Sequence, residues 1–185
     1  MSAIAYVAYG GLMLVAITAA ISDVRTGLVY NKLTYSGILF GLLFWTVCGL
    51  MGYRYGIGHS LVGMLAAFLP YALMFSLGGL GGGDVKLMSA LGAIAGSWEF
   101  VLACTVYALL VSIVMSIAVM LRKGIVKVTL MKLFTTLMLA QSGGKADGGE
   151  PLARLPFALA VAVGAGMAGL EFVVGWESPW AWLGP

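Results

Sequence analysis

The chain has 185 residues, of which 62% are hydrophobic and only 9% are charged, with a formal net charge of +3. A soluble domain carries about 25% charged residues, so the composition excludes an ordinary soluble protein. Strands of a membrane β-barrel would alternate apolar and polar residues, whereas the apolar runs here are continuous. Helices remain, because they satisfy their own backbone hydrogen bonds in lipid. We therefore expect an all-α, polytopic membrane protein.

Apolar runs divide the chain into six predicted membrane-spanning helices. The first, roughly 20 residues long, would measure ~30 Å, about one hydrocarbon thickness. The fourth is short for a full crossing and is expected to begin inside the protein. Residues 1–185 are taken as a single membrane-embedded domain. The six spans lie at about residues 3–22, 34–51, 59–78, 85–97, 99–121 and 156–175.

The distribution of cations predicts the orientation of these helices. Nine of the ten Lys and Arg residues fall in or next to the loops on one side, and Arg54 alone falls on the other side, near His59. Positively charged loops stay in the cytoplasm, so both termini should face outward from the cytoplasmic membrane. Spans one and four run in opposite directions, which places Asp23 and Asp84 on the cytoplasmic side. The nine cations are Arg25, Lys32, Lys86, Arg122, Lys123, Lys127, Lys132, Lys145 and Arg154.

The longest polar stretch, residues 122–155, is predicted to be a cytoplasmic loop that contains an interfacial helix. Val126, Leu130 and Leu133 share one helical face, and Lys132 lies on the opposite face. Such a helix would lie against membrane lipid. A seventh crossing is not expected, because it would bury Lys132 in hydrocarbon.

Two aspartates stand at the ends of apolar runs, where an ionisable group is a functional candidate. Asp84 follows three glycines, of which Gly81 and Gly83 remove side chains where the chain turns into the fourth span. The plain structural alternative is that Asp84 caps a helix that begins near Val85.

Asp23 ends the first apolar run, where a carboxylate opposes the helix macrodipole. The structural alternatives are a turn residue or an ion-pair partner for Arg25. Arg25 and Lys86 could simply anchor the topology, and Asn31 could simply cap the second span.

The two carboxylates suggest acid–base chemistry if they meet. Two carboxylates held close cannot both ionise cheaply, so they would share a proton. One would then accept a proton from water while the other donates to a carbonyl. This chemistry needs no metal or organic cofactor. We also find no cluster of metal ligands and no phosphate-binding loop in the sequence, and we expect no nucleic acid partner.

Three stretches carry a family resemblance. Asp23–Asn31, with the sequence D-V-R-T-G-L-V-Y-N, resembles the D-x-R-x-x-x-I-P-N stretch of type IV prepilin peptidases. Gly81–Lys86 is similar to their G-x-G-D-x-K stretch, and Leu155–Phe157 is similar to the proline-aromatic start of their last helix. Tyr30 stands where the family usually has proline, which leaves the loop shape after Asp23 open.

The resemblance runs through roughly residues 10–121 and the final span. It implies a membrane aspartic peptidase in which Asp23 and Asp84 are catalytic. The implied substrates are prepilin-like or preflagellin-like precursors, which are cut at the cytoplasmic face just before their hydrophobic helix. The residues implied to orient the site or bind substrate are Arg25, Asn31, Gly81, Gly83 and Lys86.

The chain has no CxxC motif. Larger family members carry an insert with paired CxxC motifs and also methylate the new N-terminus. The chain therefore resembles the short, peptidase-only branch of the Tad/Flp pilus and archaeal enzymes.

The sequence leaves three other functions open. A presenilin-like intramembrane protease also uses G-x-G-D. A proton-coupled transporter would place the carboxylates near the membrane midplane, within an inverted repeat. In a non-catalytic assembly scaffold neither aspartate would matter.

The predicted topology can be tested by cysteine labelling in a background that lacks Cys48 and Cys104. A Lys145→Cys variant should resist a membrane-impermeant thiol reagent added from outside, because its loop is cytoplasmic. An Arg54→Cys variant, on the opposite side, should react. Labelling of Lys145→Cys from outside would show the topology to be wrong.

Overall fold

The computed structural model describes residues 3–124, 131 and 156–174. In these residues the secondary structure is entirely helical, as expected from the composition. The predicted interfacial helix of the 122–155 loop lies outside the described residues, apart from 122–124 and 131. The helices are α1 (Ala3–Thr26), α2 (Asn31–Leu50), α3 (Ile57–Ser76), α4 (Gly82–Ala95), α5 (Trp98–Lys123) and α7 (Phe157–Val174).

The described helices occur at the six predicted positions. Helices α1, α2, α3 and α5 are long and apolar enough to cross a membrane, whereas α4, with 14 residues, and the apolar Phe157–Glu171 part of α7 are shorter. The protein is therefore a polytopic all-α membrane protein. The chain forms two compact units, one of Met1–Leu109 with Pro156–Pro185 and the other of Leu110–Leu155. Both aspartates lie in the first unit, which is described below.

The first loop is shorter than the sequence suggested. Helix α1 continues to Thr26 instead of ending at residue 22, and α2 begins at Asn31 instead of residue 34. The hydroxyl of Thr26 donates to the Ser22 carbonyl at 2.8 Å, so this polar side chain has a partner within the last turn. Gly27 then ends the helix with a φ of 66° and donates its N–H to the Asp23 carbonyl at 2.8 Å. Asp23 is thus inside the last turn of α1.

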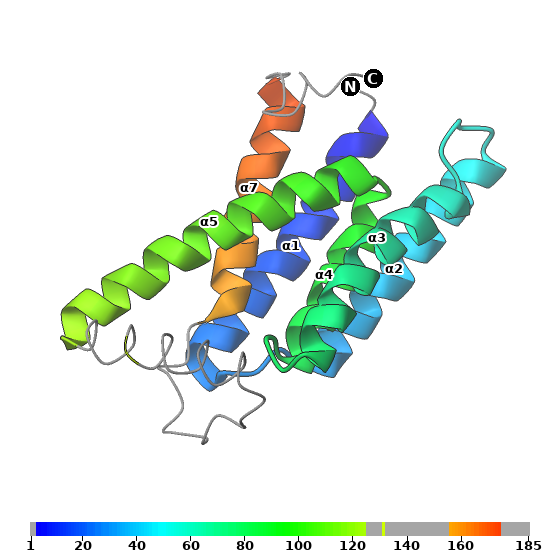
Figure 1. Cartoon of the computed structure of the whole chain (residues 1–185). Coiled ribbons are helices and arrows are strands. Elements are labelled where there is room, and N and C mark those ends of the chain that lie inside the picture. The colour runs from blue at the N-terminus through cyan, green and yellow to red at the C-terminus, as the bar shows by residue number, and fades with distance from the viewer. Residues whose placement is uncertain (1–2, 125–130, 132–155, 175–185) are drawn as a thin grey trace. The chain divides into compact units, whose positions relative to one another are not determined.

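Helix α4 lies at the centre of the first unit. It contacts α1, α2, α3 and α7, and Figure 1 shows it between α1 and α3. From Val85 to Ile94 every residue except Lys86 is buried. A helix that is apolar all round is suited to such a position. Most of this short helix is thus buried by its neighbours, whereas its first three residues, Gly82–Asp84, are only partly buried.

Glycines let the neighbours of α4 approach its backbone. A Cβ added to Gly63 of α3 would overlap the carbonyl oxygen of Gly92 in α4, and one added to Gly41 of α2 would lie 2.6 Å from the carbonyl carbon of Ala93. In lipid, small residues are the usual means of bringing two helices this close.

The close fit generates a stability prediction. Gly63→Ala should lower the free energy of unfolding by about 1–3 kcal/mol, because the added methyl group overpacks the α3–α4 contact. Gly58→Ala, in the same helix, has no neighbour within 4 Å and should be neutral or stabilising. Thermal unfolding of the purified variants in detergent measures both. Equal midpoints for the two variants would contradict the packing described here.

Candidate active site

Asp23 connects the first helix to the last one. Its Oδ2 accepts a hydrogen bond of 3.0 Å from the backbone N–H of Ala158, in the first turn of α7. The first N–H groups of a helix have no partner within the helix and carry its positive end. The α7 N-terminus therefore stabilises a carboxylate that stands unfavourably at the C-terminal end of α1.

Asp84 is the third residue of α4 and does not cap it. The N-cap of this helix is Gly81, and the backbone N–H of Asp84 donates to the Gly81 carbonyl at 3.1 Å. The alternative that Asp84 caps a helix from Val85 is thus wrong, because the glycines themselves are helical from Gly82 onward. A carboxylate in the first turn still interacts favourably with the macrodipole.

Gly81 makes room for the Asp84 carboxylate. A Cβ added to Gly81 would lie 3.2 Å from Oδ2 of Asp84, which is tighter than most contacts of a Cβ. The side chain of Asp84 is therefore folded back over the turn that precedes its own helix. Gly83 serves a different contact, because a Cβ there would lie 3.4 Å from the Cβ of Val29.

The segment after Asp23 packs against the segment around Asp84. Val29 contacts Gly83, directly before Asp84. The hydroxyl of Ser22 donates to the carbonyl of Leu28 at 2.6 Å and fixes the path of the connecting loop. The two predicted motifs, far apart in sequence, are thus neighbours in the fold.

Lys86 makes a second link between the two motifs. Its Nζ donates to Oδ1 of Asn31 at 2.9 Å and lies 5.3 Å from the ring centroid of Tyr35. Asn31 does not cap α2, because Tyr30 occupies the N-cap position and Asn31 is the first helical residue. The bond joins the first turn of α2 to the second turn of α4.

Helix α7 closes the group through aromatic packing. The ring of Tyr71 on α3 lies 6.3 Å from that of Phe157, next to the amide that binds Asp23. Tyr71 also interacts electrostatically with Asp84 and donates its hydroxyl hydrogen to Oγ1 of Thr105 at 3.3 Å. Tyr71, which interacts with Asp84, therefore packs near Phe157, the residue before the one that binds Asp23.

Arg25 takes no part in the Asn31–Lys86 hydrogen bond. It is exposed in the last turn of α1, where a cation complements the macrodipole. It lines a groove of about 470 Å³ between α1 and α7, whose other lining residues are apolar. Those residues are Ile17, Ala20, Ile21, Val24, Leu159, Ala162 and Val163.

Sequence reasoning missed two partners of the site. Nothing in the sequence indicates that the backbone amide of Ala158 binds Asp23, although the stretch Leu155–Phe157 was a clue that the start of α7 matters. Tyr35 could have been found, because it lies four residues after Asn31 and so shares its helical face. Within the described part of the chain, no three His, Cys, Asp or Glu side chains are grouped to hold a metal ion.

This arrangement is that of a polytopic membrane protein whose two motif aspartates lie in the last turn of α1 and the first turn of α4, with the loop that follows α1 beside the start of α4. The sequence profile of the type IV leader peptidase family matches residues 11–121, more than half of the chain and a range that contains both aspartates. The chain therefore belongs to the type IV leader peptidase family, and its family is one of peptidases. Comparisons with curated proteins and with solved structures give no match.

The space over Gly81 yields a prediction with a matched control next to it in the sequence. Gly81→Ala should slow cleavage, because its methyl group displaces the Asp84 carboxylate. Gly82→Ala should leave cleavage close to wild type, because its Cβ would make an ordinary contact of 3.5 Å with Phe75. The measurement is the rate of precursor cleavage in detergent, with thermal unfolding to confirm that both variants are folded. A Gly81→Ala variant as fast as Gly82→Ala would contradict the role given to Gly81.

Proposed function

We propose that the protein is a membrane aspartic endopeptidase. It removes the short leader from prepilin-like or preflagellin-like precursors at the cytoplasmic face of the cytoplasmic membrane. The observation that carries this proposal is the contact between Val29 and Gly83, which brings together the segments that follow Asp23 and precede Asp84. Membership of the type IV leader peptidase family supports it.

In this mechanism Asp23 and Asp84 act as one unit. One carboxylate accepts a proton from a water molecule, whose oxygen attacks the scissile carbonyl carbon, while the other donates a proton to the carbonyl oxygen. Collapse of the tetrahedral intermediate breaks the C–N bond, and the leaving amine takes up a proton from the pair. Each apparent pKa of this reaction belongs to the pair of carboxylates.

The positions of the two carboxylates support this role more than that of a transporter. Asp23 lies in the last turn of α1 and Asp84 in the first turn of α4, whereas a proton-carrying site is expected near the middle of the membrane. A site at the helix ends is accessible to water and to a soluble leader segment.

The neighbouring polar residues hold the unit in place. The Lys86–Asn31 hydrogen bond positions the start of α4 against the start of α2, Gly81 leaves room for the Asp84 carboxylate, and Val29 lies beside Gly83. Arg25 is suited to bind substrate, since it is exposed beside the apolar groove between α1 and α7.

Asparagine substitutions test the proposed unit. Asp23→Asn and Asp84→Asn should each abolish cleavage, because each removes a proton-transfer group while keeping its shape. The double variant should be no slower than either single variant, since the members of a catalytic unit are not additive. The fold should survive, because the amide oxygen of the Asp23→Asn side chain can still accept the Ala158 N–H.

Lys86→Ala and Arg25→Ala are the comparison variants, and they should slow cleavage without abolishing it. Precursor cleavage is followed by the band shift on a gel after reaction with purified protein. A well-folded Asp84→Asn variant that cleaves at the wild-type rate would remove the mechanism and leave Asp84 as a residue that only stabilises the start of α4.

A further inference from the structure

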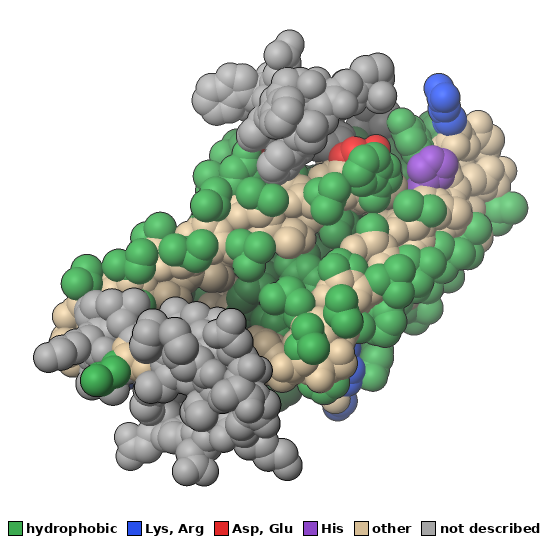
Figure 2. Space-filling model, in the orientation of Figure 1, with side chains coloured by type: hydrophobic (Ala, Val, Ile, Leu, Met, Phe, Trp, Pro, Cys, Tyr) green, Lys and Arg blue, Asp and Glu red, His purple; other side chains and the backbone are tan. Residues whose placement is uncertain are grey.

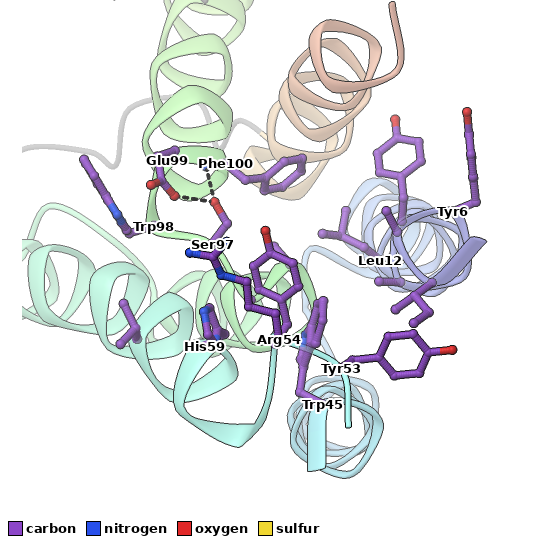
Figure 3. A pocket seen from close by; sticks show the side chains of 18 of the residues that line it. Tyr6, Leu12, Trp45, Tyr53, Arg54, His59, Ser97, Trp98, Glu99 and Phe100 are labelled. Atoms are coloured by element: carbon purple, nitrogen blue, oxygen red, sulfur yellow. Dashed lines mark hydrogen bonds between the residues drawn. The ribbon is translucent and has the colours of Figure 1, made fainter. Parts of the chain in front are cut away.

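A cavity of about 1050 Å³ lies at the end of the first unit that is opposite the aspartates. It is lined by residues of α1 between Ile4 and Leu12, by the α2–α3 loop with the start of α3, and by the turn between α4 and α5 (Figure 3). Asp23 and Asp84 are at the other ends of α1 and α4. From Asp84 to Ala95, which lines the cavity, α4 rises ~17 Å. The cavity is therefore separate from the candidate active site.

The cavity has a buried apolar floor. Ala8, Leu12, Trp45 and Phe100 line it, and each of them is buried. The indole N–H of Trp45 donates to the carbonyl of Ile94 at 2.9 Å, so the ring is fixed and presents its apolar surface. Ligand pockets usually measure ~300–1,000 Å³. The volume of this cavity is close to the upper end of that range, so it can hold a large apolar group.

The rim of the cavity is polar and aromatic. Tyr6, Tyr53, Tyr55 and Trp98 line it and are exposed, as aromatic side chains are at the level of lipid head groups. In Figure 3, Arg54, His59, Ser97 and Glu99 gather on one side, whereas Tyr6 and Leu12 lie on the other. Figure 2 shows basic, acidic and histidine side chains together at this end of the surface.

Arg54 is available to bind an anion. Among the residues that the structure describes, it has no hydrogen-bond or ion-pair partner. His59 supplies a second donor, because its Nδ1 accepts from the Gly56 N–H at 3.4 Å and the hydrogen of the neutral ring is then on Nε2. Guanidinium and imidazole N–H groups together suit a phosphate.

Glu99 adds the opposite charge on the same side of the cavity. One carboxylate oxygen accepts the hydroxyl hydrogen of Ser97 at 2.6 Å, which orients the group at the start of α5. The rim thus offers one cation and one carboxylate to a ligand, above an apolar floor. A ligand that complements both needs a phosphate, an ammonium group and hydrocarbon.

From this combination we infer that the cavity binds a phospholipid whose head group carries a phosphate and a primary ammonium, as in phosphatidylethanolamine. The phosphate binds Arg54 and His59, the ammonium binds Glu99, and an acyl chain lies against Ala8, Leu12 and Phe100. The site is independent of peptide cleavage.

Native mass spectrometry of the purified full-length protein tests the inference. The protein is mixed with equal amounts of phosphatidylethanolamine, phosphatidylglycerol and phosphatidylcholine that have the same acyl chains. The wild type should retain phosphatidylethanolamine in preference to the other two. Arg54→Gln should reduce the retention of phosphatidylethanolamine by about tenfold or more, because a charge-assisted hydrogen bond is lost.

Two further variants separate head-group recognition from general lipid binding. Glu99→Gln should abolish the preference for phosphatidylethanolamine over phosphatidylglycerol, since only the ammonium contacts the carboxylate. Arg122→Gln, an exposed cation at the far end of α5, should retain lipid as the wild type does. Arg54→Gln and Glu99→Gln should still cleave precursor, so a failure of the lipid site and a failure of the proposed peptidase are distinguishable. Equal retention by the wild type and Arg54→Gln, or no retained lipid in the wild type, would overturn the inference.

Discussion

The burial of α4 is the constraint on which the rest of the fold depends. The last carbonyl groups of this 14-residue helix have no partner within the helix, and those of the buried residues Ala93 and Ile94 need partners from neighbouring helices. At this C-terminal end, the Trp45 indole donates to the Ile94 carbonyl and the Ser60 hydroxyl donates to the Ala93 carbonyl at 2.7 Å. These bonds require α2 and α3 to approach closely, and the glycines on their inner faces permit it. The close packing of α2 and α3 against α4 is therefore also what satisfies the hydrogen bonds at the C-terminal end of α4.

The N-terminal end of α4 is less buried and holds polar residues. The first turn of a helix accepts a carboxylate readily, so Asp84 is stable there without being buried among apolar side chains. Asp23 is less favourable, since it stands at the C-terminal end of α1. The N-terminus of α7 compensates through the Ala158 N–H. The hydrogen-bond donor of this carboxylate lies 135 residues away in the sequence, so local structure alone does not explain a carboxylate at this position. This contrast is a physical reason to regard Asp23 as functional.

The sequence predicted the positions of the helices well, because apolar runs of membrane length have few alternatives. Its errors concern short-range effects. Helix α1 runs on through a polar turn to the stop at Gly27, and the start of α4 at Gly82 runs against the low helix propensity of glycine. The two aspartates were singled out because motifs mark them, and their role stays a prediction. The Ala158 amide was not found, because a backbone group has no sequence signature and its distance from Asp23 is set by tertiary packing. Tyr35 is an intermediate case, because its helical spacing from Asn31 could have predicted that both lie on the same face of α2.

The cavity was beyond prediction for a further reason. Its residues come from α1, from the α2–α3 loop and from the α4–α5 turn, and their sequence neighbours look like ordinary interfacial aromatics and a stray cation. When the cations of each predicted loop are counted, Arg54 is an exception to the positive-inside pattern. Arg54 and Glu99 line the same cavity, and together they offer opposite charges to a ligand above its apolar floor. In the predicted topology, Arg54 stands on the side that the positive-inside pattern disfavours, and a phosphate in the proposed lipid site would offset that cost. The proposed site would thus account for both the exception to the charge pattern and the cavity next to it.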